Sequence, residues 1–334
     1  MNWSGSAAIC AALLIAVCPA RAQQVIRVDG SSTVFPINTA VADDFQKARG
    51  TDARVANVRV AIAVSGTGGG FRKFCRGETD ISGASRPIRR DEMADCARAG
   101  IEYFELPVGF DALTVVVHPK NGFIRQLSIA EMKKIWEPAA EGKTLLWSEV
   151  NPAWPKQPMR LFGPGPESGT FEYFTEAVVG QAKASRRDFT ASEDDDVLVQ
   201  GVARDPNALG YFGYAYYAEN KDRLRAVPIV NDKGKAVAPS TQAVESGAYN
   251  PLARPLFIYV NARSLERPEL RQFVEHYLKS AARLVKDVRY VPLPEKTYAI
   301  AWEHVQKGRK GTVFGGGAGL GVTIEELLKR EARL

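Results

Sequence analysis

Three short segments of this chain place hydroxyl residues beside glycine or proline, at points where a strand pattern gives way to a helix pattern. They are residues 29–36 (Asp-Gly-Ser-Ser-Thr-Val-Phe-Pro), 65–71 (Ser-Gly-Thr-Gly-Gly-Gly-Phe) and 163–171 (Gly-Pro-Gly-Pro-Glu-Ser-Gly-Thr-Phe). The first N–H groups of a helix lack partners within the helix, and the helix dipole adds partial positive charge there. An oxyanion at that position receives these N–H groups together with the neighbouring hydroxyl. One such loop is only a helix cap, but three distant ones predict helix ends that converge on one tetrahedral oxyanion.

The composition is that of a globular protein with a basic balance. The chain has 334 residues, 45% hydrophobic and 25% charged, which fits two domains or one domain split by an insertion. Its 44 Lys and Arg residues are scattered among 38 Asp and Glu residues, for a net charge of +6. This mild excess helps to attract a small anion. Nucleic acid calls for a concentrated basic face, so the sequence predicts no nucleic-acid partner.

Residues 1–22 have the pattern of a secretory signal peptide. The apolar run 9–17 is too short to span a bilayer, and Ala20-Arg-Ala22 forms a cleavage pattern before Gln23. Two features depart from the pattern: residues 1–8 hold no Lys or Arg, and Cys18 raises the alternative of a lipid anchor. Because Val17 stands where such an anchor site usually has a small residue, we expect soluble export to the periplasm.

Cysteine usage agrees with export. Cys10 and Cys18 leave with the signal peptide, so that Cys75 and Cys96 remain. In an oxidising compartment such a pair favours a disulfide, and the alternative is two buried free thiols. The chain has three histidines, none at ligand spacing from the cysteines, so the sequence predicts no metal site and no cofactor.

Strand-like and helix-like segments alternate along the mature chain, which predicts an α/β fold with mainly parallel sheets. Because each hydroxyl loop follows a strand, we expect the loops at the carboxyl ends of strands, where open α/β sheets bind ligands. Expected strands include residues 25–28, 58–64, 79–87, 102–106, 113–117, 160–162, 209–214, 255–260 and 288–291. Expected helices include residues 33–48, 71–76, 128–136, 171–179, 194–203, 265–285 (with a break near Ser280), 297–307 and one from Thr323.

Motifs for nucleotide binding and for serine hydrolysis fail position by position. Residues 66–71 miss G-x-G-x-x-G because Phe71 takes the last place, and Glu137 stands where a P-loop ending at Thr144 needs its first glycine. Pro166 takes the first position of a G-x-S-x-G elbow around Ser168. A secreted phosphatase would need an activated nucleophile or a two-metal cluster, and neither is found. The sequence therefore predicts that the protein is not an enzyme.

Two charged residues are candidates for direct anion recognition. Arg86, in Ala-Ser-Arg-Pro, closes a strand and precedes a rigid proline, and its guanidinium suits a bidentate bond to an oxyanion. The alternative for Arg86 is a surface arginine beside Arg89. Asp111 lies just before a buried-looking strand, and a carboxylate there could accept the proton of monohydrogen phosphate, which sulfate lacks. The alternative for Asp111 is a capping or hinge-stabilising aspartate.

In these segments and over nearly the whole mature length, the chain resembles the periplasmic phosphate-binding proteins of ABC importers (the PstS-like family). The resemblance rests on five segments taken together: residues 29–34, 65–71, 80–87 (Asp-Ile-Ser-Gly-Ala-Ser-Arg-Pro), 167–171 and 209–216. It implies a type II binding-protein fold, with two α/β lobes that are joined by a two-stranded hinge and close around dehydrated phosphate. It also implies delivery of inorganic phosphate to a membrane permease by a monomeric receptor.

The resemblance also implies the ligand loops and the lobe boundaries. The first loop is matched by Ser32, Thr33 and Val34, the second by Thr67, and the third by Ser168, Gly169 and Thr170. One lobe should hold residues 24–113 and 255–334, and the other residues 114–254.

Two positions depart from the pattern of some family members. Those members have aspartate where this chain has Arg86, and arginine where it has Pro164. We therefore expect Arg86 to supply the cation and Asp111 to supply the proton acceptor. The alternative functions are a receptor for sulfate, arsenate or a phosphate ester, or a secreted phosphatase-like, adhesion or sensor protein.

Overall fold

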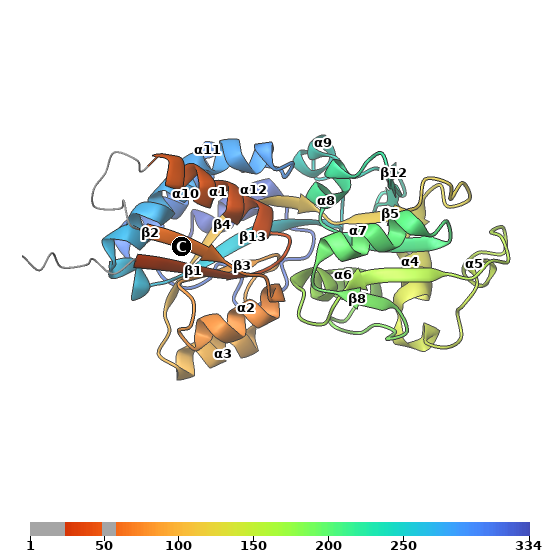
Figure 1. Cartoon of the computed structure of the whole chain (residues 1–334), viewed down its shortest axis with the longest axis horizontal. Helices are drawn as coiled ribbons and strands as arrows, with labels where there is room; N and C mark the ends of the chain where they lie inside the picture. Colours follow the sequence, from red (N-terminus) through yellow and green to blue (C-terminus); the bar gives the residue numbers. More distant parts are fainter. Residues whose placement is uncertain (1–23, 49–57) are drawn as a thin grey trace, which may run out of the picture.

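The computed structural model describes residues 24–48 and 58–334. The predicted signal peptide, residues 1–22, lies outside the described residues. The chain forms two five-stranded sheets, each flanked by helices, which lie side by side along the long axis of the molecule (Figure 1). None of the helices in the described ranges is both long and apolar enough to cross a membrane.

The first sheet has the strand order β2-β1-β3-β13-β4. In Figure 1, α1, α10 and α11 lie above this sheet and α2 and α3 lie below it. The strands are β1 (Gln24–Gly30), β2 (Val58–Ile62), β3 (Ile81–Ala84), β4 (Tyr103–Ala112) and β13 (Ala253–Asn261), and the helices are α1 (Phe35–Ala48), α2 (Gly66–Cys75), α3 (Arg90–Arg98), α10 (Pro268–Asp287), α11 (Glu295–Lys307) and α12 (Ile324–Glu331), with a 3-10 turn at Ser264–Glu266.

The second sheet has the strand order β10-β5-β9-β7-β8, and a small sheet β12-β11-β6 accompanies it. Its strands are β5 (Thr114–Val117), β7 (Arg160–Pro164), β8 (Thr190–Ser192), β9 (Ala208–Phe212) and β10 (Arg225–Ala226), and the small sheet is β6 (Leu127–Ser128), β11 (Ile229–Val230) and β12 (Ala236–Val237). The helices are α4 (Ile129–Trp136), α5 (Trp147–Val150), α6 (Gly169–Val179), α7 (Asp195–Arg204), α8 (Tyr214–Glu219) and α9 (Thr241–Glu245), with a 3-10 turn at Pro138–Ala140.

Both large sheets are mixed rather than mainly parallel. Strand β1 pairs in parallel with β2 and β3, and β7 does so with β8 and β9. Strand β13 is antiparallel to both β3 and β4, and β5 is antiparallel to both β9 and β10. The α/β class is therefore as predicted, while β13 runs against its neighbours because it enters the first sheet as the chain returns from the second.

The chain passes between the sheets at two adjacent points. Strand β4 ends at Ala112 in the first sheet and β5 begins at Thr114 in the second, so Leu113 alone makes the crossing. On the return, Leu252 immediately precedes β13, and the Leu113 N–H donates to the Leu252 carbonyl over 2.9 Å. We call the part built on the first sheet the first lobe and the part built on the second sheet the second lobe.

Most predicted helices form, with local corrections. Ser128 caps α4 through the Glu131 N–H, and Glu131 bonds back to the Ser128 N–H, which completes the predicted capping box. Helix α10 is continuous through Ser280, where a break was expected, and the Ser280 hydroxyl donates to the His276 carbonyl within the helix (2.7 Å). The expected strand at 288–291 is reduced to one bridge between Val291 and Phe110.

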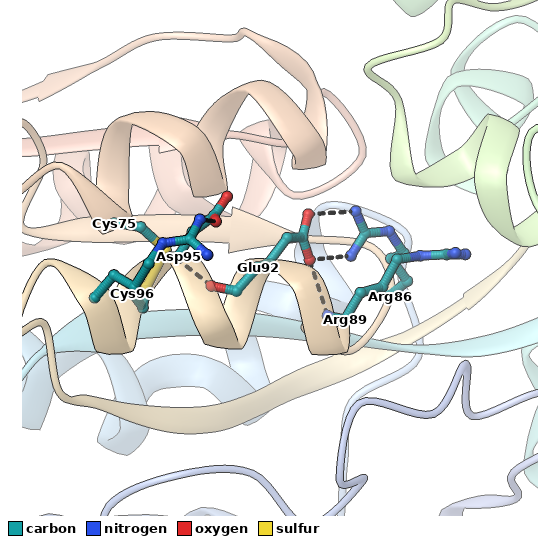
Figure 2. Close-up of a disulfide and its surroundings, with 7 residues drawn as sticks. Cys75, Arg86, Arg89, Glu92, Asp95 and Cys96 are labelled. Atoms are coloured by element: carbon teal, nitrogen blue, oxygen red, sulfur yellow. Dashed lines mark hydrogen bonds and ion pairs between the residues drawn. A yellow bond between two sulfur atoms is a disulfide. The ribbon is translucent and has the colours of Figure 1, made fainter.

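The predicted disulfide is present. Cys75 at the end of α2 is bonded to Cys96 in α3 (Figure 2). The Cys75 sulfur also lies 3.5 Å from the carbonyl oxygen of Glu92, one turn earlier in α3. The disulfide therefore fixes α3, and with it the Glu92 side chain, to the helix that follows the second hydroxyl loop.

Candidate anion-binding site

The three hydroxyl loops meet between the lobes. Thr33, from the loop between β1 and α1, and Thr170, in the first turn of α6, bring their hydroxyl oxygens to 3.1 Å although 137 positions separate them. Thr67 at the start of α2 lies 3.3 Å, oxygen to oxygen, from Ser85, which follows β3. All four side chains are buried. The three loops and the helix N-termini that follow them therefore lie close together, as predicted.

Gly169 is the point of closest approach between the second and third loops. A Cβ atom added at Gly169 would lie 2.4 Å from the Thr67 hydroxyl oxygen and 2.7 Å from that of Ser85, so only glycine fits. Ser168 caps α6, because its Oγ accepts the Thr170 N–H over 3.1 Å. These contacts hold the start of α6, in the second lobe, against the start of α2, in the first.

The first loop is also fixed by its own backbone. The Val34 N–H donates to the Ser31 carbonyl (3.1 Å), and the Val34 side chain is fully buried. Gly83 of β3 is the neighbour that leaves room for it, since a Cβ at Gly83 would lie 3.2 Å from the Val34 Cβ. Ser32 is likewise buried, and the Tyr216 hydroxyl of α8 donates to its carbonyl over 2.9 Å.

Arg254 lies beneath the hydroxyl groups at the start of β13, and sequence reasoning missed it. Its Nη2 donates to Thr170 Oγ1 (2.9 Å) and approaches Thr33 Oγ1 (3.3 Å), so one guanidinium reaches both lobes. The side chain is completely buried. A single arginine at the start of an otherwise apolar strand was the available signal, and the register of β13 against β4 places it opposite Asp111.

Asp111 is the only carboxylate paired with Arg254 in the described part of the chain. Its Oδ2 accepts from Nε (3.1 Å) and Nη2 (2.8 Å) of Arg254, and its Oδ1 accepts the Tyr214 N–H (2.8 Å). Asp111 therefore orients the arginine and anchors the start of α8. Nη1 of Arg254 is buried and has no hydrogen-bond partner within residues 24–48 and 58–334. We call Thr33, Asp111, Thr170 and Arg254 the Arg254 cluster.

Arg86, the cation expected from the sequence, has a different set of partners. Its guanidinium makes two bonds to Glu92, from Nη1 (2.8 Å) and Nη2 (2.7 Å), and Figure 2 shows this paired geometry. Its Nε lies 2.9 Å from Oε2 of Glu172 in α6, and Nη1 also donates to the Pro87 carbonyl (3.0 Å). Burial disfavours the charge of Arg86, but Glu92 and Glu172 together raise its pKa above the ordinary value.

The ion pairs around Arg86 extend between the lobes. Arg89, at the start of α3, pairs with Glu172 (2.7 Å) and with Glu176 (3.0 Å), both on α6. We call Arg86, Arg89, Glu92, Glu172 and Glu176 the Arg86 cluster. It contains three carboxylates for two guanidinium groups, so its cations are neutralised within the protein.

A second buried carboxylate lies on the other side of the first loop. Asp195 is the first residue of α7, and the Ser32 hydroxyl lies 3.4 Å from its Oδ2, across the lobes. Burial raises the pKa of Asp195 to about 8. Sequence reasoning predicted only a helix over residues 194–203, because nothing local shows which of the carboxylates at its start turns inward.

Two lobes joined by two adjacent crossings, with helix N-termini gathered between them, define a two-lobed binding protein. A family model described as a PBP superfamily domain matches residues 19–280. Protein SphX of Synechococcus elongatus is 49% identical over 92% of this chain and 89% of its own length. Phosphate-binding protein PstS of Staphylococcus saprophyticus is 35% identical over 88% and 90%.

Comparison with solved structures gives the same class of protein. The crystal structure of "a possible phosphate binding protein" from Planctomyces limnophilus is 45% identical, with a TM-score of 0.62, and the match covers 85% of this chain and 98% of that one. An ABC-type phosphate transport receptor from Vibrio cholerae shares the fold at 19% identity, with a TM-score of 0.60 over 80% and 100% of the two chains. The chain belongs to the PBP superfamily and, within it, to the PstS-like family of phosphate-binding proteins. This is a family of substrate-binding proteins.

Proposed function

We propose that this protein captures inorganic phosphate between its lobes and delivers it to the membrane permease of an ABC phosphate importer. The observation that carries the proposal is the Arg254 cluster. A buried guanidinium with an unpartnered Nη1 lies among hydroxyl groups from both lobes, and Asp111 is the only carboxylate that forms an ion pair with it within the described residues. Such a site favours a small, multiply charged oxyanion that can accept several hydrogen bonds.

The ligand loops in this proposal are those predicted from the sequence. Ser32, Thr33 and Val34 supply the first loop, Thr67 the second, and Ser168, Gly169 and Thr170 the third. Arg254 takes the cationic role that the sequence assigned to Arg86, because Arg254 has a free donor and Arg86 is held by carboxylates. Asp111 keeps Arg254 in place, so its contribution to affinity is indirect.

Affinity in this proposal comes from charge-assisted hydrogen bonds in a cleft that closes and excludes water. Closure is a hinge motion about the crossings at Leu113 and Leu252. We propose lobe boundaries at 24–113 with 255–334 and at 114–254. We assign the protein no catalytic step, and we propose that it reaches the periplasm through its cleaved signal peptide and acts there as a monomer.

The test is a competition titration on the mature protein, in which phosphate, arsenate and sulfate are added singly and against one another. We expect tight phosphate binding with one site per chain, arsenate competing directly and sulfate competing weakly. Sulfate as the tightest ligand would overturn the phosphate assignment, and no anion binding would overturn the receptor function. A phosphatase assay with and without divalent metal should show no turnover, and turnover would overturn the assignment of no catalytic step.

A further inference from the structure

A pocket separate from the Arg254 cluster lies between the lobes. Its volume is about 560 Å³, within the range of roughly 300–1,000 Å³ that is usual for small-molecule sites. The second lobe contributes side chains from α8, from the turn that follows it and from α9, and the first lobe contributes the last turn of α10 and the segment after it. A hinge motion between the lobes would therefore open or close this pocket.

The charged residues that line this pocket are mostly cationic. Lys221 comes from the second lobe, Lys286 and Arg289 come from the first, and Glu245 of α9 is the one carboxylate among the described lining residues. Within residues 24–48 and 58–334, none of these four side chains forms an ion pair. The pocket thus holds an excess of positive charge that is drawn from both lobes.

Two other cations of α10 show the usual arrangement of a helix surface. Lys279 pairs with Glu275 over 2.7 Å, and Arg283 pairs with Asp44 of α1 over 2.8 Å. The cations of the pocket therefore differ from their neighbours on the same helix, which are paired within the protein. The partner that the pocket cations lack is one that an anionic ligand can supply.

Arg289 occupies a backbone position that would suit glycine. Its φ is 68°, in the left-handed region, which is unfavourable for a residue with a Cβ atom. Strain of this kind is common at functional positions. The segment that carries it is fixed, because Val291 and Phe110 of β4 exchange two backbone hydrogen bonds of 2.8 and 3.0 Å. The Arg289 side chain is therefore presented to the pocket from a well-anchored backbone.

Lys221 is held on the opposite wall by two aromatic rings. Its Nζ lies 5.8 Å from the ring centroids of both Tyr214 and Tyr217, at the distance of cation–π contacts. Such contacts orient the ammonium group without neutralising its charge. Lys221 therefore keeps its positive charge available to a ligand in the pocket.

The walls of the pocket adjoin the Arg254 cluster. Tyr214, which lines the pocket, donates its N–H to Asp111 over 2.8 Å. Tyr290 also lines the pocket, and a Cβ atom added at Gly213 would lie 2.9 Å from its hydroxyl and 3.6 Å from Oδ2 of Asp111. Lining residues from both lobes thus reach the same carboxylate, so that the position of the lobes affects both sites together.

We propose that this pocket is a second anion site, which binds a condensed phosphate between Lys221 on one lobe and Lys286 and Arg289 on the other. Exposed ion pairs contribute little one by one, because water screens them, so a single small anion is held weakly there. An anion with several phosphate groups engages all three cations at once, and the volume of the pocket admits it. The inference goes beyond the proposed function, because it adds a second site and a second class of ligand.

The experiment titrates inorganic tripolyphosphate into the mature protein by calorimetry at low ionic strength, without phosphate and with a slight excess of phosphate. We expect one tripolyphosphate per chain in both conditions. Because groups of both lobes hold it, tripolyphosphate should bind the closed form more tightly than the open form. Phosphate should therefore strengthen tripolyphosphate binding, and tripolyphosphate should strengthen phosphate binding by the same factor.

Two double variants separate the pocket from general attraction to a basic protein. Lys286→Gln with Arg289→Gln removes the cations of the first lobe from the pocket and should lower the tripolyphosphate affinity at least tenfold (about 1.4 kcal/mol). The matched control is Lys133→Gln with Lys134→Gln, which removes the same charge from the exposed face of α4. The control should keep the wild-type affinity, and circular dichroism first shows that each variant is folded.

The outcomes that contradict the second site are distinct from failure of the first. No tripolyphosphate binding to wild type, or equal losses in the two double variants, would overturn the site. Tripolyphosphate binding that phosphate weakens or leaves unchanged would overturn the bridging of the lobes. Wild-type protein that binds no phosphate would overturn the proposed function instead, while the titration without phosphate would still test the pocket.

Discussion

Two buried arginines connect the lobes, and the comparison between them is the basis for proposing Arg254 as the ligand's cation and Arg86 as a structural one. Arg86 is 1% exposed and Arg254 is 0% exposed, so burial does not distinguish them. Their partners do. Arg86 is paired with Glu92 and Glu172, whereas Arg254 has Asp111 and two threonine hydroxyls, and its Nη1 remains without a partner among the described residues. The hydrogen-bond partners of a buried guanidinium, rather than its depth, support the proposal that the anion binds at Arg254.

The two clusters also differ in what closure would do to them. In the Arg86 cluster, α3 and α6 bring opposite charges together, so closure is favoured by contacts within the protein. In the Arg254 cluster, closure brings hydroxyl groups from both lobes toward one guanidinium, which is paired with Asp111 but whose Nη1 donor has no partner within the described residues. Burying an unsatisfied donor of a charged group is costly unless an acceptor joins it. The first cluster therefore holds the lobes together, and we propose that the second makes the ligand part of the closed state.

The largest expected effect comes from Arg254→Ala. This change removes the free donor and leaves Asp111 buried without its cation, and losses of about 4 kcal/mol are typical when such a pair is broken. We expect phosphate affinity, measured by calorimetry, to fall about thousandfold. The double variant Arg254→Met with Asp111→Asn removes the unpaired charge and should fold well while still failing to bind. Affinity within tenfold of wild type in either variant would place the ligand cation elsewhere.

Arg86→Ala should act first on stability. Glu172, which is 0% exposed, would keep, among the described residues, only Arg89 and the more distant Lys183 as cationic partners. We expect the free energy of unfolding in urea to fall by about 3 kcal/mol, the scale for breaking a buried ion pair. Adding Glu172→Gln to Arg86→Met should recover much of that loss and keep phosphate binding within about hundredfold of wild type. A double variant that is stable but binds as poorly as Arg254→Ala would make Arg86 a direct ligand after all.

Removing the disulfide tests the two clusters separately, because Cys96 lies in α3, which contributes Glu92 to the Arg86 cluster and nothing to the Arg254 cluster. Cys75→Ser with Cys96→Ser frees α3, which carries Glu92, from α2 (Figure 2). The disulfide spans 21 residues and should contribute about 3 kcal/mol to the free energy of unfolding. Urea titration of the double variant measures this loss. Since neither cysteine touches the Arg254 cluster, phosphate affinity should change less than stability does. A loss of affinity at full occupancy of the folded state would show that the two clusters are coupled.

The smallest expected effect is on how the folding stability of the ligand-free protein depends on pH. Burial raises the pKa of Asp195 to about 8, above its value in the unfolded chain. Between these two pKa values the folded state holds more protons than the unfolded state, so its stability falls as pH rises. Asp195→Asn should flatten that slope, and melting temperatures at about pH 8 should then exceed those of wild type by a few degrees. Glu105 and Glu331 titrate in the same direction in all variants, so the comparison uses the difference in slope. An identical slope would show that Asp195 is not desolvated without ligand.

The parts of the site that could be predicted from sequence are those that local chemistry specifies. A strand, a turn with glycine and hydroxyl residues, and a helix can be recognised in fewer than ten residues, and Thr33, Thr67 and Thr170 were found in this way. Their convergence was a joint inference from three loops. The disulfide followed from the count of cysteines in an exported chain.

The parts that could not be predicted depend on pairing across long separations. Arg254 meets Asp111 over 143 positions, and this contact exists only because β13 runs antiparallel to β4 in one register. The carboxylates that engage Arg86 lie on two helices, and Glu172 is 86 positions away. A motif shows that an arginine follows a strand, but it does not show how many carboxylates surround that arginine in the fold. The mixed character of the sheets was missed for the same reason, since a strand pattern carries no direction.

The most direct measurement is a crystal structure of the mature protein grown with arsenate, whose arsenic atom gives an anomalous signal that locates the anion without ambiguity. We predict one peak between the lobes, with oxygen atoms within hydrogen-bond distance of Arg254 Nη1 and of the Thr33 and Thr170 hydroxyls, while Arg86 keeps its bonds to Glu92 and Glu172. A peak coordinated by Arg86, with Arg254 still bound only to Asp111 and the threonines, would contradict the account.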